Sequence, residues 1–283
     1  MSEFLAALLD PSLPFIRYAF ITGILASIPF GIIGTYVVVR RISYIAGAIS
    51  HCILGGIGIG LYLQNAVGIS WFTPLLGAVF VALLAAVVLS LVSMFAKQRE
   101  DSVIGALWAS GMGIGLLFLA KTPGYVDPMS YLFGNILLIT RTDIFLVLAL
   151  DVLVVGVIVL FYNVFLAVCF DDEFAGLRGI HTRWFYLVLL CLTALTIVLL
   201  VRVVGIVMVI ALLTLPAAIA GNFASSIKQM MLLSMVLCCI FILSGLSTSY
   251  VLDLPSGPVI IVIAAGVYLT VVVGAKLLAH RST

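Results

Sequence analysis

Long apolar segments separated by short polar ones run the whole length of this chain. About 20 apolar residues in a helix cross a bilayer, and nine segments meet that length: residues 15–39, 43–63, 72–96, 102–120, 144–168, 184–201, 205–222, 229–249 and 258–277. The stretch 184–222 is nearly continuous and is broken only by Arg202 and Gly205. The pattern therefore predicts an all-α, polytopic membrane helix bundle of eight to nine transmembrane helices.

A shorter apolar piece, residues 131–139, lies between polar flanks within the segment 122–142. It is too short to cross a bilayer. We therefore predict a short half-helix or interfacial helix, which lies on the outer side if nine spans are counted.

Residues 170–180 (FDDEFAGLRGI) hold three acids and an arginine between two apolar runs. A bilayer cannot solvate such a segment, so it must lie in water. Phe170, Phe174 and Leu177 recur at helical spacing opposite the acids, and Gly179 provides a helix end. The pattern predicts an amphipathic surface helix suited to docking another protein; an ordinary surface loop is the alternative.

Composition agrees with a membrane protein. Of the 283 residues 65% are hydrophobic and 8% are charged, whereas soluble domains are about a quarter charged. No polar stretch reaches the size of a soluble domain, so we expect one membrane-embedded domain over residues 1–283. The net charge of +2 gives no reason to expect a nucleic-acid partner.

The distribution of Lys and Arg predicts the orientation. With nine spans and an outer N-terminus, nine of the thirteen positive residues fall in inner loops or the C-terminal tail. Inner loops carry the excess of positive charge in membrane proteins. We therefore expect the N-terminus outside, the C-terminus in the cytoplasm, and residues 170–180 on the cytoplasmic side.

One histidine is predicted to lie near the middle of the bilayer. His51 is nine residues beyond Ile42, about 13 Å along a helix, and an ionisable residue at that depth by default marks a pathway. Gly47, Gly55 and Gly58 share its face. This face either packs against another helix, with His51 donating a hydrogen bond, or leaves room for a divalent transition metal bound by the imidazole.

Three acids are further candidates. Asp151 lies about 12 Å below the outer surface and either substitutes as a carboxylate ligand near His51 or is protonated or bonded to a neighbouring helix. Asp127 and Asp253 lie at outer Pro-Gly turns. They either rim an entrance or contact a metal-binding protein, or they are ordinary solvated acids.

Two other features bear on packing. Ser102, Ala106, Ala109 and Gly113 form a stripe of small residues at helical spacing, which predicts close helix approach around a pore or at a dimer seam. Arg202, near the outer end of its span, is long enough to reach the interface and is given no special role.

Several motifs resemble the zinc/manganese permease family of ATP-binding-cassette importers. Residues 40–45 (RRISYI) followed by Ser50 and His51 match its signature. Other matches follow in order along the chain: Arg99–Ser102 with Ile104 and Gly105, Leu132–Leu137, residues 170–180, Gly205 with Leu212 and Leu213, Pro216–Ala218, and Ser249 and Tyr250 with Asp253–Gly257.

The resemblance implies a permease subunit that moves zinc or manganese, with iron as a further candidate, by alternating access. It implies a second permease copy, a separate cytoplasmic ATPase that binds the ATP, an extracytoplasmic metal-binding protein, and residence in a bacterial-type cytoplasmic membrane. It also implies a set of ATPase-coupling residues, namely Asp171, Glu173, Phe174, Ala175 and Gly179, together with Ile180. Asp172 stands where the family has a proline.

The chain departs from the family at Gly47, where an aspartate usually lies on the same face as His51. A chelate or vitamin permease of the same architecture is therefore an alternative, and a gradient-driven secondary transporter is a less favoured one. The sequence has no GxxxxGK[ST], HExxH or GxSxG motif, so we predict a transporter subunit rather than an enzyme, without a tightly bound cofactor.

Overall fold

The computed structural model describes residues 14–95, 100–124, 128–134 and 139–281, which form helices and no strand. Eight helices of this part of the chain are long and apolar enough to cross a membrane. They are α2 (Pro14–Val39), α3 (Ser43–Tyr62), α4 (Pro74–Phe95), α5 (Glu100–Lys121), α7 (Arg141–Leu160), α10 (Thr182–Val204), α12 (Ile227–Leu252) and α13 (Ser256–Arg281). The shorter elements are the π-helical turn η1 (Leu63–Val67), α6 (Pro128–Phe133), α8 (Tyr162–Phe170), α9 (Asp172–Leu177) and α11 (Ile206–Ala220).

The fold class predicted from the sequence is confirmed, but two of the predicted spans have other bounds. The span expected at 144–168 is divided at Phe161, whose φ of −112° and ψ of 20° end α7 before α8 begins. The span expected at 205–222 is α11, with 15 residues. A helix of that length covers about 22 Å, less than the roughly 30 Å of a hydrocarbon core.

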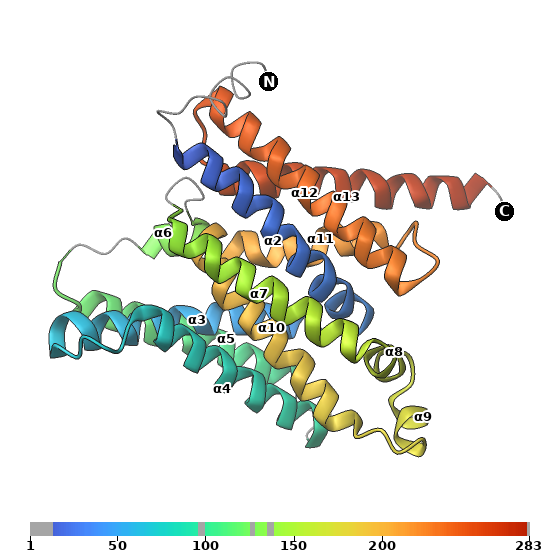
Figure 1. Cartoon of the computed structure of the whole chain (residues 1–283), viewed down its shortest axis with the longest axis horizontal. Coiled ribbons are helices and arrows are strands. Elements are labelled where there is room, and N and C mark those ends of the chain that lie inside the picture. Colours follow the sequence, from blue (N-terminus) through green and yellow to red (C-terminus); the bar gives the residue numbers. More distant parts are fainter. Residues whose placement is uncertain (1–13, 96–99, 125–127, 135–138, 282–283) are drawn as a thin grey trace.

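The helices run between two ends of the bundle (Figure 1), which we name after their short helices. At the α6 end, a Cβ on Gly205 would meet the backbone of Gly134, just after α6, and Arg202 pairs with Asp143 of α7. At the α9 end, Arg40 at the end of α2 lies 3.4 Å from Asp172 of α9. Since α10 begins beside α9 and α11 begins beside α6, α11 returns the chain toward the α9 end.

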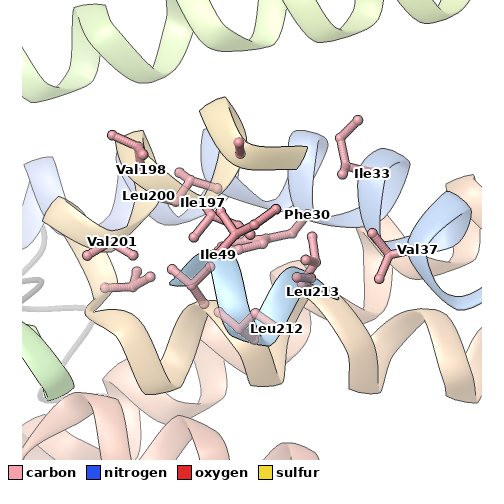
Figure 2. Packing of buried hydrophobic residues seen from close by; sticks show 14 of the residues in the cluster. Phe30, Ile33, Val37, Ile49, Ile197, Val198, Leu200, Val201, Leu212 and Leu213 are labelled. Carbon is pink, nitrogen blue, oxygen red and sulfur yellow. The ribbon is translucent and has the colours of Figure 1, made fainter. Parts of the chain in front are cut away.

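The core lies where α2, α3, α10 and α11 meet (Figure 2), and these four helices are mostly buried. Phe30, Ile49, Ile197 and Leu213 contribute one fully buried side chain from each of them. By contrast, few residues of α5 and of the described part of α13 are fully buried, as expected for helices that face lipid or another protein.

Glycines set how closely α3 approaches its neighbours. A Cβ on Gly55 would lie 2.9 Å from the carbonyl oxygen of Gly111, and one on Gly58 would lie 2.6 Å from that of Gly115, both on α5. The small-residue face of α3 therefore packs tightly against α5. The predicted stripe on α5 lies on another face, because Ala106 is exposed like the rest of that stripe.

We predict that Gly205→Ala destabilises the protein by about 1–3 kcal/mol. Gly205 has φ +82° and ψ 162°, a conformation that residues with a side chain rarely adopt, and a Cβ there would clash with the Gly134 backbone. The measurement is the free energy of unfolding in detergent micelles.

Gly156→Ala is the matched control. Gly156 lies inside α7, and a Cβ there would meet no atom within 4 Å. Alanine at that position should leave stability unchanged or raise it by about 0.5–1 kcal/mol. Equal destabilisation by both variants would contradict the assigned role of the Gly205–Gly134 contact.

Candidate functional site

The surface helix predicted at 170–180 is α9, and it is shorter than expected. Phe170 belongs to α8, and Asp171 then adopts an extended backbone with φ −153°. Its side chain caps α9 by accepting a hydrogen bond from the Phe174 amide at 2.9 Å. The helix is closed by Gly179 at φ +80°, where glycine bears no steric penalty.

The apolar side of α9 points away from the chain. Phe174 is 52% exposed and Leu177 is 88% exposed, whereas Ala175 is only 1% exposed. The acids Asp172 and Glu173 occupy the first turn, where they complement the positive end of the helix dipole. An exposed apolar pair beside acids, on a helix that is itself anchored, is a surface suited to another protein.

Arg40 ties α9 to the bundle. One of its guanidinium nitrogens donates to the Val168 carbonyl oxygen of α8 at 2.9 Å, and another lies 3.4 Å from Asp172. The guanidinium also lies 5.4 Å from the ring centroid of Tyr186 on α10. A displacement of α9 would therefore also move the ends of α2, α8 and α10, which Arg40 contacts.

Positive residues expected in the inner loops gather at this end. Arg40, Arg41 and Arg183 line one cavity beside Asp172, and Arg178 lies 4.9 Å over the Phe174 ring. Lys228 at the start of α12 lies 4.8 Å over the ring of Tyr162 on α8. Five positive side chains of the described residues therefore lie at the α9 end.

His51 lies half-buried on α3 and stacks on Trp108 of α5. The ring centroids are 4.3 Å apart with planes 17° from parallel. Its Nδ1 atom is buried and has no hydrogen-bond partner. A Cβ on Gly47, one turn earlier, would lie 3.4 Å from the same Trp108 ring.

Asp151 is buried on the face of α7 that packs against α2 and α10, and neither carboxyl oxygen has a hydrogen-bond partner. By contrast, α3 packs chiefly against α4 and α5. His51 and Asp151 therefore come from helices with different main neighbours. Within the described residues, no three His, Cys, Asp or Glu side chains form a group that could hold a metal ion.

Of the two predicted outer acids, one can be placed. Asp253 is exposed at the end of α12, with a left-handed φ of 52°. Gly257, four residues later, packs against the Phe133 carbonyl of α6, so Asp253 lies at the α6 end. Asp127 lies outside the described residues.

An ion pair at the α6 end was missed by the sequence reasoning. Arg202 Nε lies 3.0 Å from Oδ1 of the buried Asp143. The other oxygen of Asp143 accepts hydrogen bonds from the Thr140 amide at 3.0 Å and hydroxyl at 2.6 Å, which forms a capping box. The signal was present in the Thr140-to-Asp143 spacing and in the scarcity of charges that could pair with Arg202.

Taken together, these features are those of a membrane transport protein: a bundle of apolar helices with an anchored, exposed surface helix beside several arginines. The family model for the ABC 3 transport family matches residues 12–275. The chain belongs to this family.

Relatives and a solved structure agree. The chain is 38% identical over 259 residues to a Chlamydia pneumoniae protein named "Probable metal transport system membrane protein", covering 90% of this chain and 88% of that one. It is 29% identical over 269 residues to the manganese import system permease protein ScaB of Streptococcus gordonii, covering 95% and 94%. The structure of PsaBC from Streptococcus pneumoniae in complex with Fab matches with a TM-score of 0.83 at 28% identity, covering 95% and 94%.

We predict that Asp171→Ala frays α9, because it removes the side-chain oxygen that caps the Phe174 amide. Loss of a helix cap costs about 1 kcal/mol, which corresponds to about fivefold faster amide exchange in residues 172–177. Hydrogen-exchange mass spectrometry of this peptide measures the effect.

Asp171→Asn is the matched control, since asparagine retains a capping oxygen. Its α9 amides should exchange at the wild-type rate. If the alanine variant matched the wild type, or if the asparagine variant frayed equally, the capping role of Asp171 would be wrong.

Proposed function

We propose that this chain is the membrane-spanning permease subunit of an ATP-binding-cassette importer for divalent transition metal ions, with manganese as the first candidate and zinc as the second. Transport proceeds by alternating access and is driven by a separate ATPase subunit. The observation that carries the proposal is the family match over residues 12–275. The manganese substrate named for relatives such as ScaB supports the choice of metal.

The ATPase docks on α9. Phe174 and Glu173 provide the contact, since Phe174 is exposed and Glu173 lies in the solvated first turn. Asp171, Ala175 and Gly179 act within the chain: Asp171 caps the helix, Ala175 packs it, and Gly179 closes it. Because the chain has no phosphate-binding GxxxxGK[ST] loop, ATP is hydrolysed on the partner.

Closure of the ATPase pair then moves α9 and, through Arg40, the end of α2. The bonds from Arg40 to Val168 and Asp172 join α2, α8 and α9. Because α2 packs against α7, α11 and α12, a shift at its end redirects several spans. Packed cores of this kind switch between discrete arrangements rather than deforming continuously.

A second copy of the chain completes the pathway. It packs on the exposed small-residue stripe of α5, of which Ala106, Ala109 and Gly113 allow close helix approach. His51 lies on α3 directly beside α5 and provides one imidazole ligand per copy. The unpartnered Nδ1 atom supports this role, because a buried nitrogen without a partner costs free energy.

We assign roles to carboxylates at two other places, inside the membrane and on its outer side. Asp151 is the intramembrane acid, and its two unpartnered oxygens support a role with a transient cation. Asp253 contacts an extracytoplasmic metal-binding protein at the α6 end, and we extend this role to Asp127 from the sequence alone. The α9 end, which holds Arg40, Arg41, Arg178, Arg183 and Lys228, faces the cytoplasm of a bacterial-type membrane, so the N-terminus lies outside and the C-terminus inside. Residues 1–283 act as one permease domain.

One observation favours a second candidate, a permease for a metal chelate. Gly47 provides no carboxylate beside His51, and a side chain there would contact Trp108 instead. A chelate would carry its own ligands and would not require His51.

We predict that His51→Phe lowers uptake of manganese about tenfold or more, because phenylalanine keeps the stack on Trp108 but has no nitrogen ligand. The measurement is ATP-dependent uptake of manganese, zinc and iron into liposomes that contain the permease and its ATPase. Uptake is compared at equal amounts of folded protein.

Cys52→Ala, at the next position on α3, is the control and should transport like the wild type. If uptake by His51→Phe equals that of the wild type, His51 is not a ligand. If the wild type and His51→Phe transport a metal chelate equally well and neither transports the free metal ions, the second candidate is favoured.

We predict that Asp151→Asn lowers metal uptake and metal affinity about tenfold or more, since the amide keeps the shape of the side chain but loses its negative charge. The control is Thr196→Val, another buried side chain whose oxygen has no partner. Unchanged uptake and affinity in Asp151→Asn would remove this residue from the pathway.

A further inference from the structure

A polar cavity at the α9 end lies apart from His51, Asp151 and Asp253, which are proposed above to contact the metal or its binding protein. It has a volume of about 390 Å³ and is enclosed by the ends of α2 and α4, by α8 and α9, and by the start of α10. The neighbouring ends of these helices are seen together in Figure 1. A cavity of this size is within the ~300–1,000 Å³ range of sites for small ligands.

The lining of the cavity is positively charged. Arg40, Arg41 and Arg183 oppose the single acid Asp172, so three positive charges and one negative give a net charge of +2. The Arg40–Asp172 distance of 3.4 Å is long for a charge-assisted hydrogen bond, and Asp172 is 57% exposed. The local charge therefore favours an anionic ligand.

Arg41 occupies a position that would suit glycine. Its φ of 58° places it in the left-handed region, where the turn after α2 is closed by the Arg41 amide donating to the Val38 carbonyl and the Ile42 amide donating to that of Val37. An arginine held in this disfavoured conformation at a cavity wall points to a role for its side chain.

The cavity also has an apolar part to its lining. Ile42, Met94 and Val168 lie among the arginines, and they belong to the ends of segments that continue into the apolar bundle. The exposed Phe174 and Leu177 of α9 do not line the cavity. A ligand here would therefore meet both charged and apolar side chains.

We propose that this cavity binds the phosphate group of an anionic phospholipid headgroup. The guanidinium group matches phosphate through paired N–H donors, and basic pockets between membrane helices on the cytoplasmic side are suited to such headgroups. The acyl chains then extend from the cavity toward the apolar outer surface of the bundle. This site is independent of the transported substrate.

The test is native mass spectrometry of the full-length protein in detergent, titrated with phosphatidylglycerol or phosphatidylcholine. The wild type should retain phosphatidylglycerol in preference to phosphatidylcholine. Arg41→Gly and Arg183→Ala should each weaken its binding about fivefold, the effect of one positive charge near a headgroup. Arg41→Gly tests the site without a folding penalty, because glycine accepts φ 58°.

Arg41→Lys retains the charge but lacks the paired donors, so its binding of phosphatidylglycerol should fall between that of the wild type and that of Arg41→Gly. Arg178→Ala removes a positive charge from the same end of the bundle but outside the cavity, and it should bind like the wild type. Equal binding by Arg41→Gly and the wild type, or an equal loss in Arg178→Ala, would overturn the proposal.

Two further arms distinguish other anions. In one outcome, millimolar inorganic phosphate binds to the wild type but not to Arg41→Gly, and the wild type shows no preference between the two lipids. The cavity then binds free phosphate, and the proposal of a lipid headgroup is wrong. If Arg41→Gly weakens binding of the ATPase but leaves phosphatidylglycerol binding unchanged, the cavity receives a carboxylate of that partner and the proposal falls.

Discussion

The backbone N–H and C=O groups inside this bundle have to find partners within the protein, because the hydrocarbon of a bilayer provides none. The main breaks in the helices accordingly lie at the ends of the bundle. At Gly205, one helix ends and the next begins where the residues after α6 pack against the backbone. At Asp171, α8 ends, and the Asp171 side chain caps the next helix. His51 and Asp151 are among the side chains that keep buried atoms without a hydrogen-bond partner, and an ionisable group in that state inside a membrane is costly.

The two ends of the bundle handle charge in different ways. At the α6 end, Asp143 is buried and its oxygens are divided between a capping box and Arg202. At the α9 end, three arginines share one cavity with a single aspartate, and Arg40 divides its donors between α8 and α9. The first arrangement fixes a helix start, whereas the second leaves net positive charge beside the helix that we assign to ATPase docking.

Close backbone contacts determine which helices become neighbours. Lipid chains are as apolar as leucine, so the hydrophobic effect does not select one helix pair over another within a membrane, and packing of small residues does so instead. Gly55 and Gly58 bring α3 against α5 and place His51 on Trp108. This leaves the other face of α5, with Ala106 and Gly113, open for a further helix.

The sequence by itself determined the helical class, the approximate spans and the position of the surface helix, because each depends on local composition and spacing. The division at Phe161, the shortness of α11, the Arg202–Asp143 pair and the arginine cavity became visible only in the tertiary structure. The ion pair and the cavity are formed by segments far apart in the chain, as Arg40 and Asp172 are. A single sequence records which side chains are available, whereas the packing of backbones against one another decides which of them meet.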